Sequence, residues 1–288
     1  MAFVTIGTNL PSIAAQRRLQ DVTSDLSGTF ERLSSGLRIT SAADDAAGLA
    51  IADQLRADSR IAAQAIRNAN DGVSYVSIGD SALEEIGNVL TRMAELAEQS
   101  ANGAITTNAR SSLDSEFAAL GSEIYRIARN TEFNGLNLLS GSSAVTLQVG
   151  LDSSSDSQIT IQAVESTLIS LGLGTTDTEA LTYSLNGVNI TDASTAATTA
   201  LTAVQNAIDL VSSKRGTFGA VESRLTYAVS NLQVQRENLV SAESQIRDAD
   251  VAFEAANLVR QQVVQQAAST VLSQANQQPA LALSLLTG

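Results

Sequence analysis

Cysteine, histidine and tryptophan are all absent from this chain of 288 residues. Without cysteine there can be no disulfide and no thiol chemistry, and without histidine there can be no Ser-His or Cys-His catalytic couple and no Cys/His zinc site. Aromatic residues make up only 3% of the chain, although 44% of it is hydrophobic. This composition favours helices packed through small side chains over the core of a globular enzyme. We therefore expect no catalytic site, no metal and no cofactor.

Proline is almost absent as well, with Pro11 and Pro279 as its two occurrences. Proline disrupts a helix because it lacks the backbone N–H and its ring clashes with the preceding turn. The proline-free stretch 12–278 can therefore form very long helices, and Pro279 is predicted to end the last of them.

Charge is missing from both ends of the chain. Residues 1–16 and 261–288 carry no charged side chain, although the whole chain has 30 Asp+Glu against 17 Lys+Arg, a net charge of −13. Chain ends are normally the most solvated part of a domain, so uncharged ends with apolar residues indicate segments that are buried against a partner. The acidic balance argues against nucleic acid and anionic membranes as that partner.

Targeting signals are also missing. No run of about 18 apolar residues is present, so we expect no membrane-spanning helix. The first 16 residues have neither a basic region nor a clean apolar region, so we expect export, if it occurs, to proceed without a cleaved signal peptide.

Apolar residues recur at helical spacing along both halves of the chain. Ser34-Ser35-Gly36 interrupts the first stripe, and Ser41 to Asp44 has the spacing of a capping box, which predicts a new helix opening at Asp44-Asp45. This capping role is favoured over an acid/base role for the two carboxylates. The first stripe consists of Leu19, Val22, Leu26, Phe30, Leu33 and Leu37.

A regular heptad pattern lies in the C-terminal half. Such a repeat is typical of coiled coils, because residues at a and d positions share one helix face. Its members are Leu225, Leu232, Leu239 and Ile246, interleaved with Val221, Ala228, Gln235 and Ala242.

The centre of the chain has a different composition, with no Lys or Arg between residues 141 and 200. Alternating apolar residues at 145–149 and 159–161 predict a short β-hairpin. Asn186-Gly187 is a second candidate hairpin turn, and Phe133-Asn134-Gly135 reads as a turn. The expected fold is therefore mainly α, a long antiparallel helical hairpin or coiled-coil bundle with a small central β-hairpin region.

The first apolar stripe is too short to order a helix by itself. Burial of six apolar side chains stabilises a helix by less than the ordering of about 20 residues costs. We expect each terminal arm to be mostly disordered alone and helical when several copies pack together.

Several motifs, in the right order and separation, closely resemble bacterial flagellin. The resemblance covers about residues 1–140 and 200–288. Its motifs are Leu33-Ser-Ser-Gly-Leu-Arg-Ile39, Ser41-Ala-Ala-Asp-Asp-Ala-Ala-Gly48, Arg67-Asn-Ala-Asn-Asp-Gly72, Phe133-Asn-Gly135, Ser244-Gln-Ile-Arg-Asp-Ala-Asp250 and Val271-Leu-Ser-Gln-Ala-Asn-Gln277.

The resemblance implies a domain plan. Residues 1–43 and 247–288 would form the inner core of a filament, and residues 44–140 and 200–246 an outer helical layer. The insert 141–199 would hold the β-hairpin, with no large outer domains. Asn70-Asp71-Gly72, which reads locally as a turn, would lie within or beside a long helix.

The resemblance also implies a structural function, as the subunit that self-polymerises into the extracellular bacterial flagellar filament for motility. A hook–filament junction protein of the same superfamily is the alternative. Expected partners are other copies of the chain, an export chaperone at the C-terminal region, and the filament cap and hook-junction proteins. The side chains expected between subunits are Leu19, Val22, Leu26, Phe30, Leu33, Val264, Val271, Leu272, Leu283, Leu285 and Leu286.

One further family site transfers to particular positions. Family members recognised by the Toll-like receptor for flagellin present an Arg, a Leu four residues on and a Glu from the next helix, and Arg92, Leu96 and Glu116 occupy these positions. Thr91 stands where the family usually has Gln.

Overall fold

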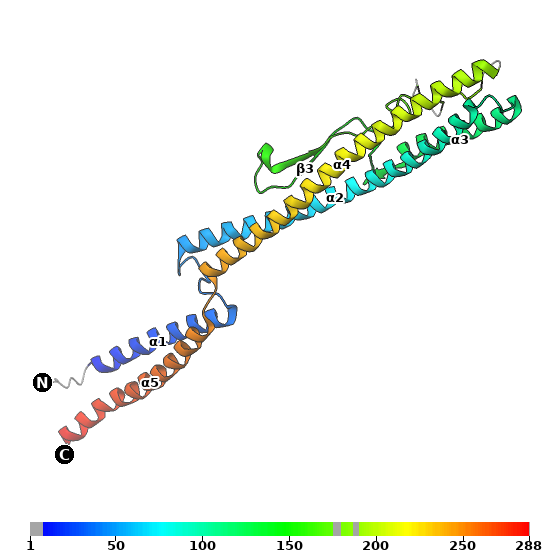
Figure 1. Ribbon diagram of the computed structural model, residues 1–288. Coiled ribbons are helices and arrows are strands. Elements are labelled where there is room, and N and C mark those ends of the chain that lie inside the picture. The colour runs from blue at the N-terminus through cyan, green and yellow to red at the C-terminus, as the bar shows by residue number, and fades with distance from the viewer. Residues whose placement is uncertain (1–7, 175–179, 187–189, 288) are drawn as a thin grey trace. The chain divides into compact units, whose positions relative to one another are not determined.

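The computed structural model describes residues 8–174, 180–186 and 190–287, and for 190, 191 and 280–287 it describes the backbone alone. The chain divides into two compact units, unit 1 (residues 1–59 and 237–288) and unit 2 (residues 60–236). Five α-helices in the described part carry most of the structure. They are α1 (Leu10–Ser35), α2 (Ala46–Ala101), α3 (Thr107–Asn130), α4 (Ile190–Arg247) and α5 (Val251–Thr287) (Figure 1). The mainly α fold class is thereby confirmed.

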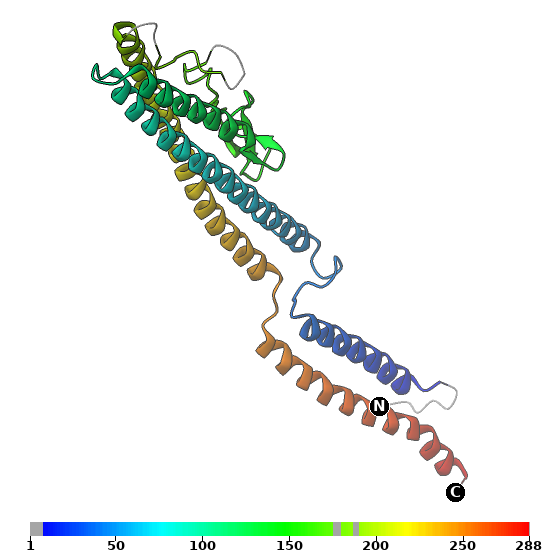
Figure 2. The same cartoon turned by 90° about the vertical axis from the view of Figure 1, so that its right-hand side faces the viewer.

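In unit 2, α2 and α4 lie side by side over most of their length, and α3 packs along them (Figures 1 and 2). Their facing sides form one core, in which large apolar side chains are fully buried. The core includes Leu83, Ile86, Leu90 and Met93 of α2, Phe117 and Ile124 of α3, and Val204, Val211, Phe218 and Leu225 of α4.

Glycines on α2 let α4 approach closely. A Cβ on Gly79 would lie 2.5 Å from Cε2 of Phe218. A Cβ on Gly72 would collide with Leu147 of the insert and would lie 3.2 Å from Cδ1 of Leu225. Phe218 and Leu225 are seven residues apart, as are Gly79 and Gly72, so two side chains of α4 lie over glycines at heptad spacing, and Leu147 fills the rest of the space at Gly72. Gly72 therefore lies inside α2, which confirms the placement implied by the family resemblance and overturns the local prediction of a turn.

The predicted turn at Phe133-Asn134-Gly135 is confirmed. It joins β1 (Glu132–Phe133) to β2 (Leu136–Asn137), which pair antiparallel. Asn134 and Gly135 both have positive φ, 51° and 76°, as the two central residues of a type I′ turn require.

The β-hairpin of the insert is also confirmed. Strand β3 (Val145–Gln148) pairs antiparallel with β4 (Gln158–Ile161), with Val145 opposite Ile161. Ile159 and Ile161 are buried in the core of unit 2, so one face of the hairpin packs against the helices.

The second hairpin, expected around Asn186-Gly187, is not supported, because residues 181–184 form no strand. Residues 187–189 lie outside the described part of the chain. Asp114 of α3 explains the difference, since its carboxylate accepts hydrogen bonds from the backbone N–H of Leu185 at 2.7 Å and the hydroxyl of Ser184 at 2.9 Å. These side-chain bonds to α3 take the place of a strand partner.

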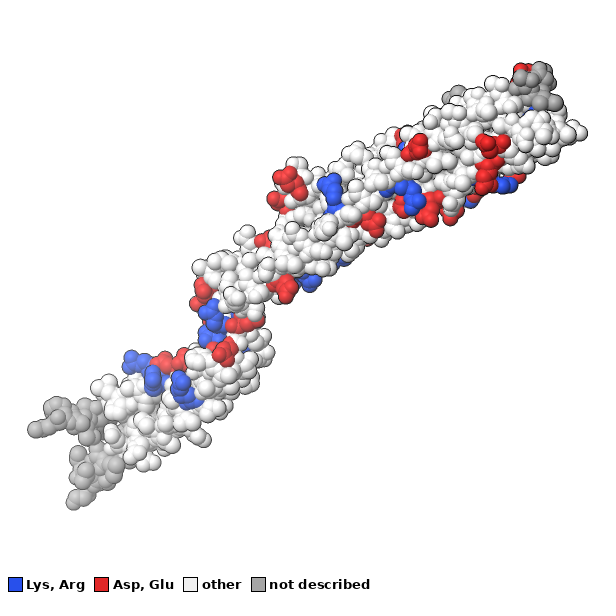
Figure 3. Space-filling model, viewed as in Figure 1, with Lys and Arg blue, Asp and Glu red and all other residues white. Residues whose placement is uncertain are grey.

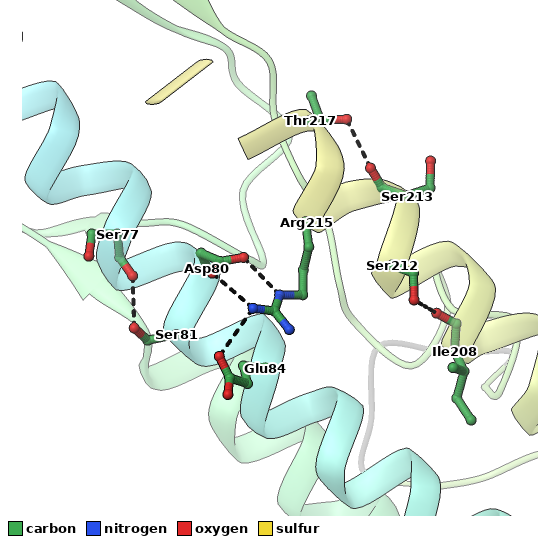
Figure 4. Close-up of polar contacts among 9 residues, drawn as sticks. All are labelled: Ser77, Asp80, Ser81, Glu84, Ile208, Ser212, Ser213, Arg215 and Thr217. Atoms are coloured by element: carbon green, nitrogen blue, oxygen red, sulfur yellow. Dashed lines mark hydrogen bonds and ion pairs between the residues drawn. The ribbon is translucent and has the colours of Figure 1, made fainter. Parts of the chain in front are cut away.

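An ion cluster ties α4 to α2 at the surface of unit 2 (Figure 4). The guanidinium of Arg215 bonds Asp80 at 2.8 and 3.1 Å and Glu84 at 3.1 Å. The side chains of Arg215, Asp80 and Glu84 are 39%, 33% and 58% exposed, so each ion pair contributes about 0.2–1 kcal/mol at most. The cluster fixes the register of the two helices, while the buried apolar core supplies most of the stabilisation.

The end of α1 agrees with the sequence prediction, and the start of α2 lies slightly later than predicted. α1 ends at Ser35, and Gly36 caps it with φ of 72° and an N–H that donates to the carbonyl of Arg32 at 2.9 Å. α2 begins at Ala46, later than the Asp44-Asp45 start predicted, because Asp45 acts as the N-cap and accepts from the N–H of Gly48 at 2.9 Å.

The prediction that Pro279 ends the last helix is wrong, since α5 continues through it to Thr287. A proline at 279 removes the hydrogen bond to the carbonyl of Ala275, four residues earlier. The side-chain amide of Asn9 donates to that carbonyl at 2.8 Å. The helix therefore keeps all its carbonyls satisfied at this point through a residue at the other end of the chain.

We expect Gly79→Ala to destabilise unit 2 by about 1–3 kcal/mol, because the added methyl group collides with the buried ring of Phe218. Gly219→Ala on α4 is the matched control, since a Cβ there meets nothing within 4 Å. It should stabilise the helix by about 0.5–1 kcal/mol. Urea unfolding followed by circular dichroism measures both changes, and equal effects of the two substitutions would contradict the close approach.

Candidate assembly surface

In unit 1, α1 and α5 lie side by side (Figures 1 and 2). Polar contacts join them, with the hydroxyl of Ser12 donating to Asn276 at 2.6 Å and the amide of Gln265 donating to the hydroxyl of Thr23 at 3.3 Å. The apolar and uncharged polar side chains buried along this pair are small, namely Ser12, Ala15, Val22, Thr29 and Ala275, and the carboxylate of Glu254 is buried as well. The two helices can therefore approach closely, but the pair has no core of large side chains.

Large apolar side chains on both helices remain at the surface. Phe30 is 62% exposed, Phe253 61% and Val271 59%. The further exposed members of this set are Leu10, Ile13, Val251, Val259, Val263 and Val264. Such a concentration of exposed large hydrophobic residues marks an interaction surface. We call these nine residues the apolar terminal surface.

A small apolar hollow lies between the two helices. Its volume is about 210 Å³, and Ala15, Val264, Ala267, Ala268 and Val271 line it together with Arg18. Because no polar atom other than those of Arg18 borders it, the hollow suits an apolar side chain.

The residues expected between subunits fall into four groups. Phe30, Val264 and Val271 belong to the apolar terminal surface, and Val22 is buried between α1 and α5. Leu19, Leu26, Leu33 and Leu272 are half-buried. The side chains of Leu283, Leu285 and Leu286 lie outside the described residues.

The sequence prediction missed Leu10, Ile13, Val251, Phe253, Val259 and Val263. The prediction followed the apolar stripe of each helix. Phe253 continues the stripe of α5, since it lies 18 residues before Val271, and the other five residues lie off the stripes. The adjacent pair Val263-Val264 was the available signal, because neighbouring apolar residues in a helix point in different directions and cannot both face one partner.

The surface of the described part of α1 and α5 near the chain ends carries little charge. In Figure 3 the charged side chains gather elsewhere, and the region beside the uncertain terminal residues is white. Charged side chains there would have to be desolvated in any contact, so their absence favours burial of this region.

The connection between α1 and α2 is built around the carboxylate of Asp44. One of its oxygens accepts from the N–H of Ser41 at 3.0 Å and from the hydroxyl and N–H of Thr40 at 3.0 and 3.1 Å. The guanidinium of Arg32 lies 3.3 Å from the other oxygen. These bonds, led by the one from Ser41, hold the pKa of Asp44 well below its ordinary value.

The three residues expected to contact the immune receptor lie together in unit 2, in two different settings. The guanidinium of Arg92 on α2 bonds the carboxylate of Glu116 on α3 at 2.9 and 3.0 Å and that of Glu95 at 2.9 Å. Both partners of the Arg92–Glu116 pair are about half exposed. Leu96 is only 1% exposed and packs in the core beneath them.

Catalytic features are not found among the described residues. No group of three or more Asp or Glu side chains there could hold a metal ion. Within the same part of the chain, no helix has the length and hydropathy needed to cross a membrane. The fold and the apolar terminal surface are those of a helical structural protein.

Comparison with known proteins agrees with this class. The model of the bacterial flagellin N-terminal helical region matches residues 6–144, and that of the C-terminal helical region matches residues 201–286. A flagellin from Halalkalibacterium halodurans is 40% identical over 282 residues, and one from Bacillus subtilis is 36% identical over 303 residues. In both cases the match covers 98% of this chain and 99% of the relative.

Two solved structures are also similar. A crystal structure of Bacillus cereus flagellin is 32% identical, with a TM-score of 0.47 over 58% of this chain and 88% of the other. A putative flagellar hook-associated protein from Vibrio parahaemolyticus has a TM-score of 0.57 at 15% identity, over 71% of this chain and all of the other, and is similar in fold alone.

The chain belongs to the bacterial flagellin family. It is a structural subunit of the flagellar filament, in a short form, and not an enzyme. The alternative of a hook–filament junction protein has less support, since the relatives that match over the full length are flagellins and a flagellar filament core protein from Treponema phagedenis.

We expect Asp44 to be still ionised at about pH 3.9, where an unfolded Asp is half protonated. Because its folded pKa is lowered, the stability that its carboxylate contributes is fully present above about pH 3.9 and is lost as the pH falls through the lower folded value. The carboxyl ¹³C shift of Asp44, followed by NMR against pH, measures the midpoint.

Thr40→Val supplies the matched control, because it removes one hydroxyl donor and should raise the pKa of Asp44 toward its ordinary value. A midpoint near or above 3.9 in the unchanged protein would contradict the arrangement.

Proposed function

We propose that copies of this chain join through the apolar terminal surface, and that α1 and α5 form the inner core of the filament. The observation that carries the proposal is the exposure of Phe30, Phe253 and Val271 on a helix pair whose own buried apolar side chains are small. Burial of one such side chain contributes roughly 1.5–3 kcal/mol, so several per subunit supply a strong driving force for assembly.

The same reasoning supports a domain plan. Residues 1–43 and 247–288 form the inner core, residues 44–140 and 200–246 the layer around it, and residues 141–199 carry the β-hairpin beside that layer. Unit 2 has a large apolar core within one chain, which suits a layer that folds without partners.

The uncovered apolar surface also supports two expectations about the unassembled chain. An export chaperone covers the C-terminal helix before secretion. The filament cap and the hook-junction proteins then contact the subunits at the two ends of the filament.

Val271→Asp should abolish elongation of filament seeds, because it places a charge in the apolar terminal surface and beside the apolar hollow. Val271→Leu is the matched control and should elongate seeds, since the surface stays apolar. Electron microscopy and sedimentation of polymer measure both. Normal elongation by Val271→Asp, or failure of the unchanged protein to elongate, would contradict the proposal.

A second role is supported by the exposed pair of Arg92 and Glu116. We infer that the Toll-like receptor for flagellin contacts these two charged groups, while the buried Leu96 supports them from beneath. Leu96 would then affect receptor binding by holding Arg92 and Glu116 in position, without touching the receptor itself.

Arg92→Ala should lower the response of a receptor reporter assay at least about tenfold, in line with the loss of a charged hot spot at an interface. Arg126→Ala on α3 removes a similarly exposed ion pair, with Glu123, and should leave the response unchanged. No response to the unchanged protein would reject this role without affecting the assembly proposal.

A further inference from the structure

The segment that follows α1 and the segment that precedes α5 are joined to each other by backbone hydrogen bonds. The N–H of Arg38 donates to the carbonyl of Arg247 at 2.6 Å, and the N–H of Ala249 donates to the carbonyl of Gly36 at 2.9 Å. Leu37 and Asp248 form the antiparallel bridge between these bonds. We call residues 36–38 and 246–249 the clasp.

Side chains hold both halves of the clasp. The guanidinium of Arg38 donates to the carbonyl of Ile246 at 2.5 Å, and that of Arg247 bonds Asp53 at 3.3 Å. Arg32 lies between Asp44 at 3.3 Å and Glu254, a buried carboxylate of α5, at 3.9 Å. Charged groups from α1, α2, α4 and α5 therefore meet around one short pairing of backbone.

Beyond the clasp, α1 and α5 are joined by polar contacts such as Ser12 with Asn276 and Gln265 with Thr23, and the apolar side chains buried between them are small. A subunit that joins a filament must order both helices, and this ordering costs conformational entropy. Contacts that fix the C-terminal end of α1 beside the N-terminal end of α5 beforehand reduce that cost, as preorganisation does in other binding processes.

We propose that the clasp preorganises the subunit for assembly: when it closes, the last turn of α1 is held beside the first turn of α5, and the pair adds to a filament more readily. The proposal rests on the assembly function proposed above. An open and a closed clasp are two states of one equilibrium, and a partner that binds the closed state better shifts the population toward it.

A disulfide across the bridge tests the proposal. Paired residues in an antiparallel ladder have Cα atoms about 4.5–5.5 Å apart, within the range that a disulfide spans. The chain has no cysteine, so Leu37→Cys with Asp248→Cys can form one intramolecular bond only. The oxidised and reduced forms of this variant are compared for their critical concentration on filament seeds.

The oxidised form should have a critical concentration lower than the reduced form by roughly threefold or more. Its unassembled chains should also show slower hydrogen exchange at the amides of α1 and α5. Leu37→Ser with Asp248→Ser, treated with the same oxidant, controls for loss of the two side chains and should not respond.

An unchanged or higher critical concentration of the oxidised form would overturn the proposal, and so would failure of the disulfide to form in both monomer and filament. If the unchanged protein does not elongate seeds at all, the assembly function itself fails, which is a different result. Elongation by the unchanged protein together with no benefit from the disulfide rejects the clasp alone.

Discussion

The structure depends on one constraint, which is that α1 and α5 cannot cover their own apolar side chains. The pair buries Ala15, Val22 and Ala275 with a few small polar residues, while Phe30, Phe253 and Val271 stay exposed. Hydrophobic burial is the main favourable term in folding, so a helix pair without a large core gains most of its stability from partners. This explains why the ends of a strongly acidic chain carry no charge.

Unit 2 also has large apolar side chains to bury, but it buries them within one chain. Phe218 and Leu225 of α4 fill the spaces over Gly79 and Gly72 of α2, so large side chains pack tightly within one chain. The two units therefore differ in how they treat their apolar side chains. Unit 2 buries them in its own core, and α1 and α5 of unit 1 leave many of them exposed.

Local sequence signals predicted local structure well where one residue type determines the backbone. Gly36 ends α1, and Asn134-Gly135 forms the tight turn between β1 and β2, because both need positive φ. The signals failed where distant residues intervene. Asn9 satisfies the carbonyl freed by Pro279, so the helix continues, and Asp114 binds the segment that was expected to form a second hairpin. Asn70-Asp71-Gly72 has the residue types of a turn, yet Gly72 lies inside α2, where it leaves room for side chains packed against the helix.

The sequence by itself determined the family, the long helices, the first β-hairpin and the absence of cysteine and histidine chemistry, since each follows from residue types and their spacing. Tertiary structure decided which apolar residues are exposed, because that depends on which side of α1 meets α5, and the periodicity of one helix does not contain this information. It also decided that Leu96 is buried below Arg92 and Glu116, and that Leu37 meets Asp248. Pairings between residues more than 200 positions apart arise only when the whole chain has folded.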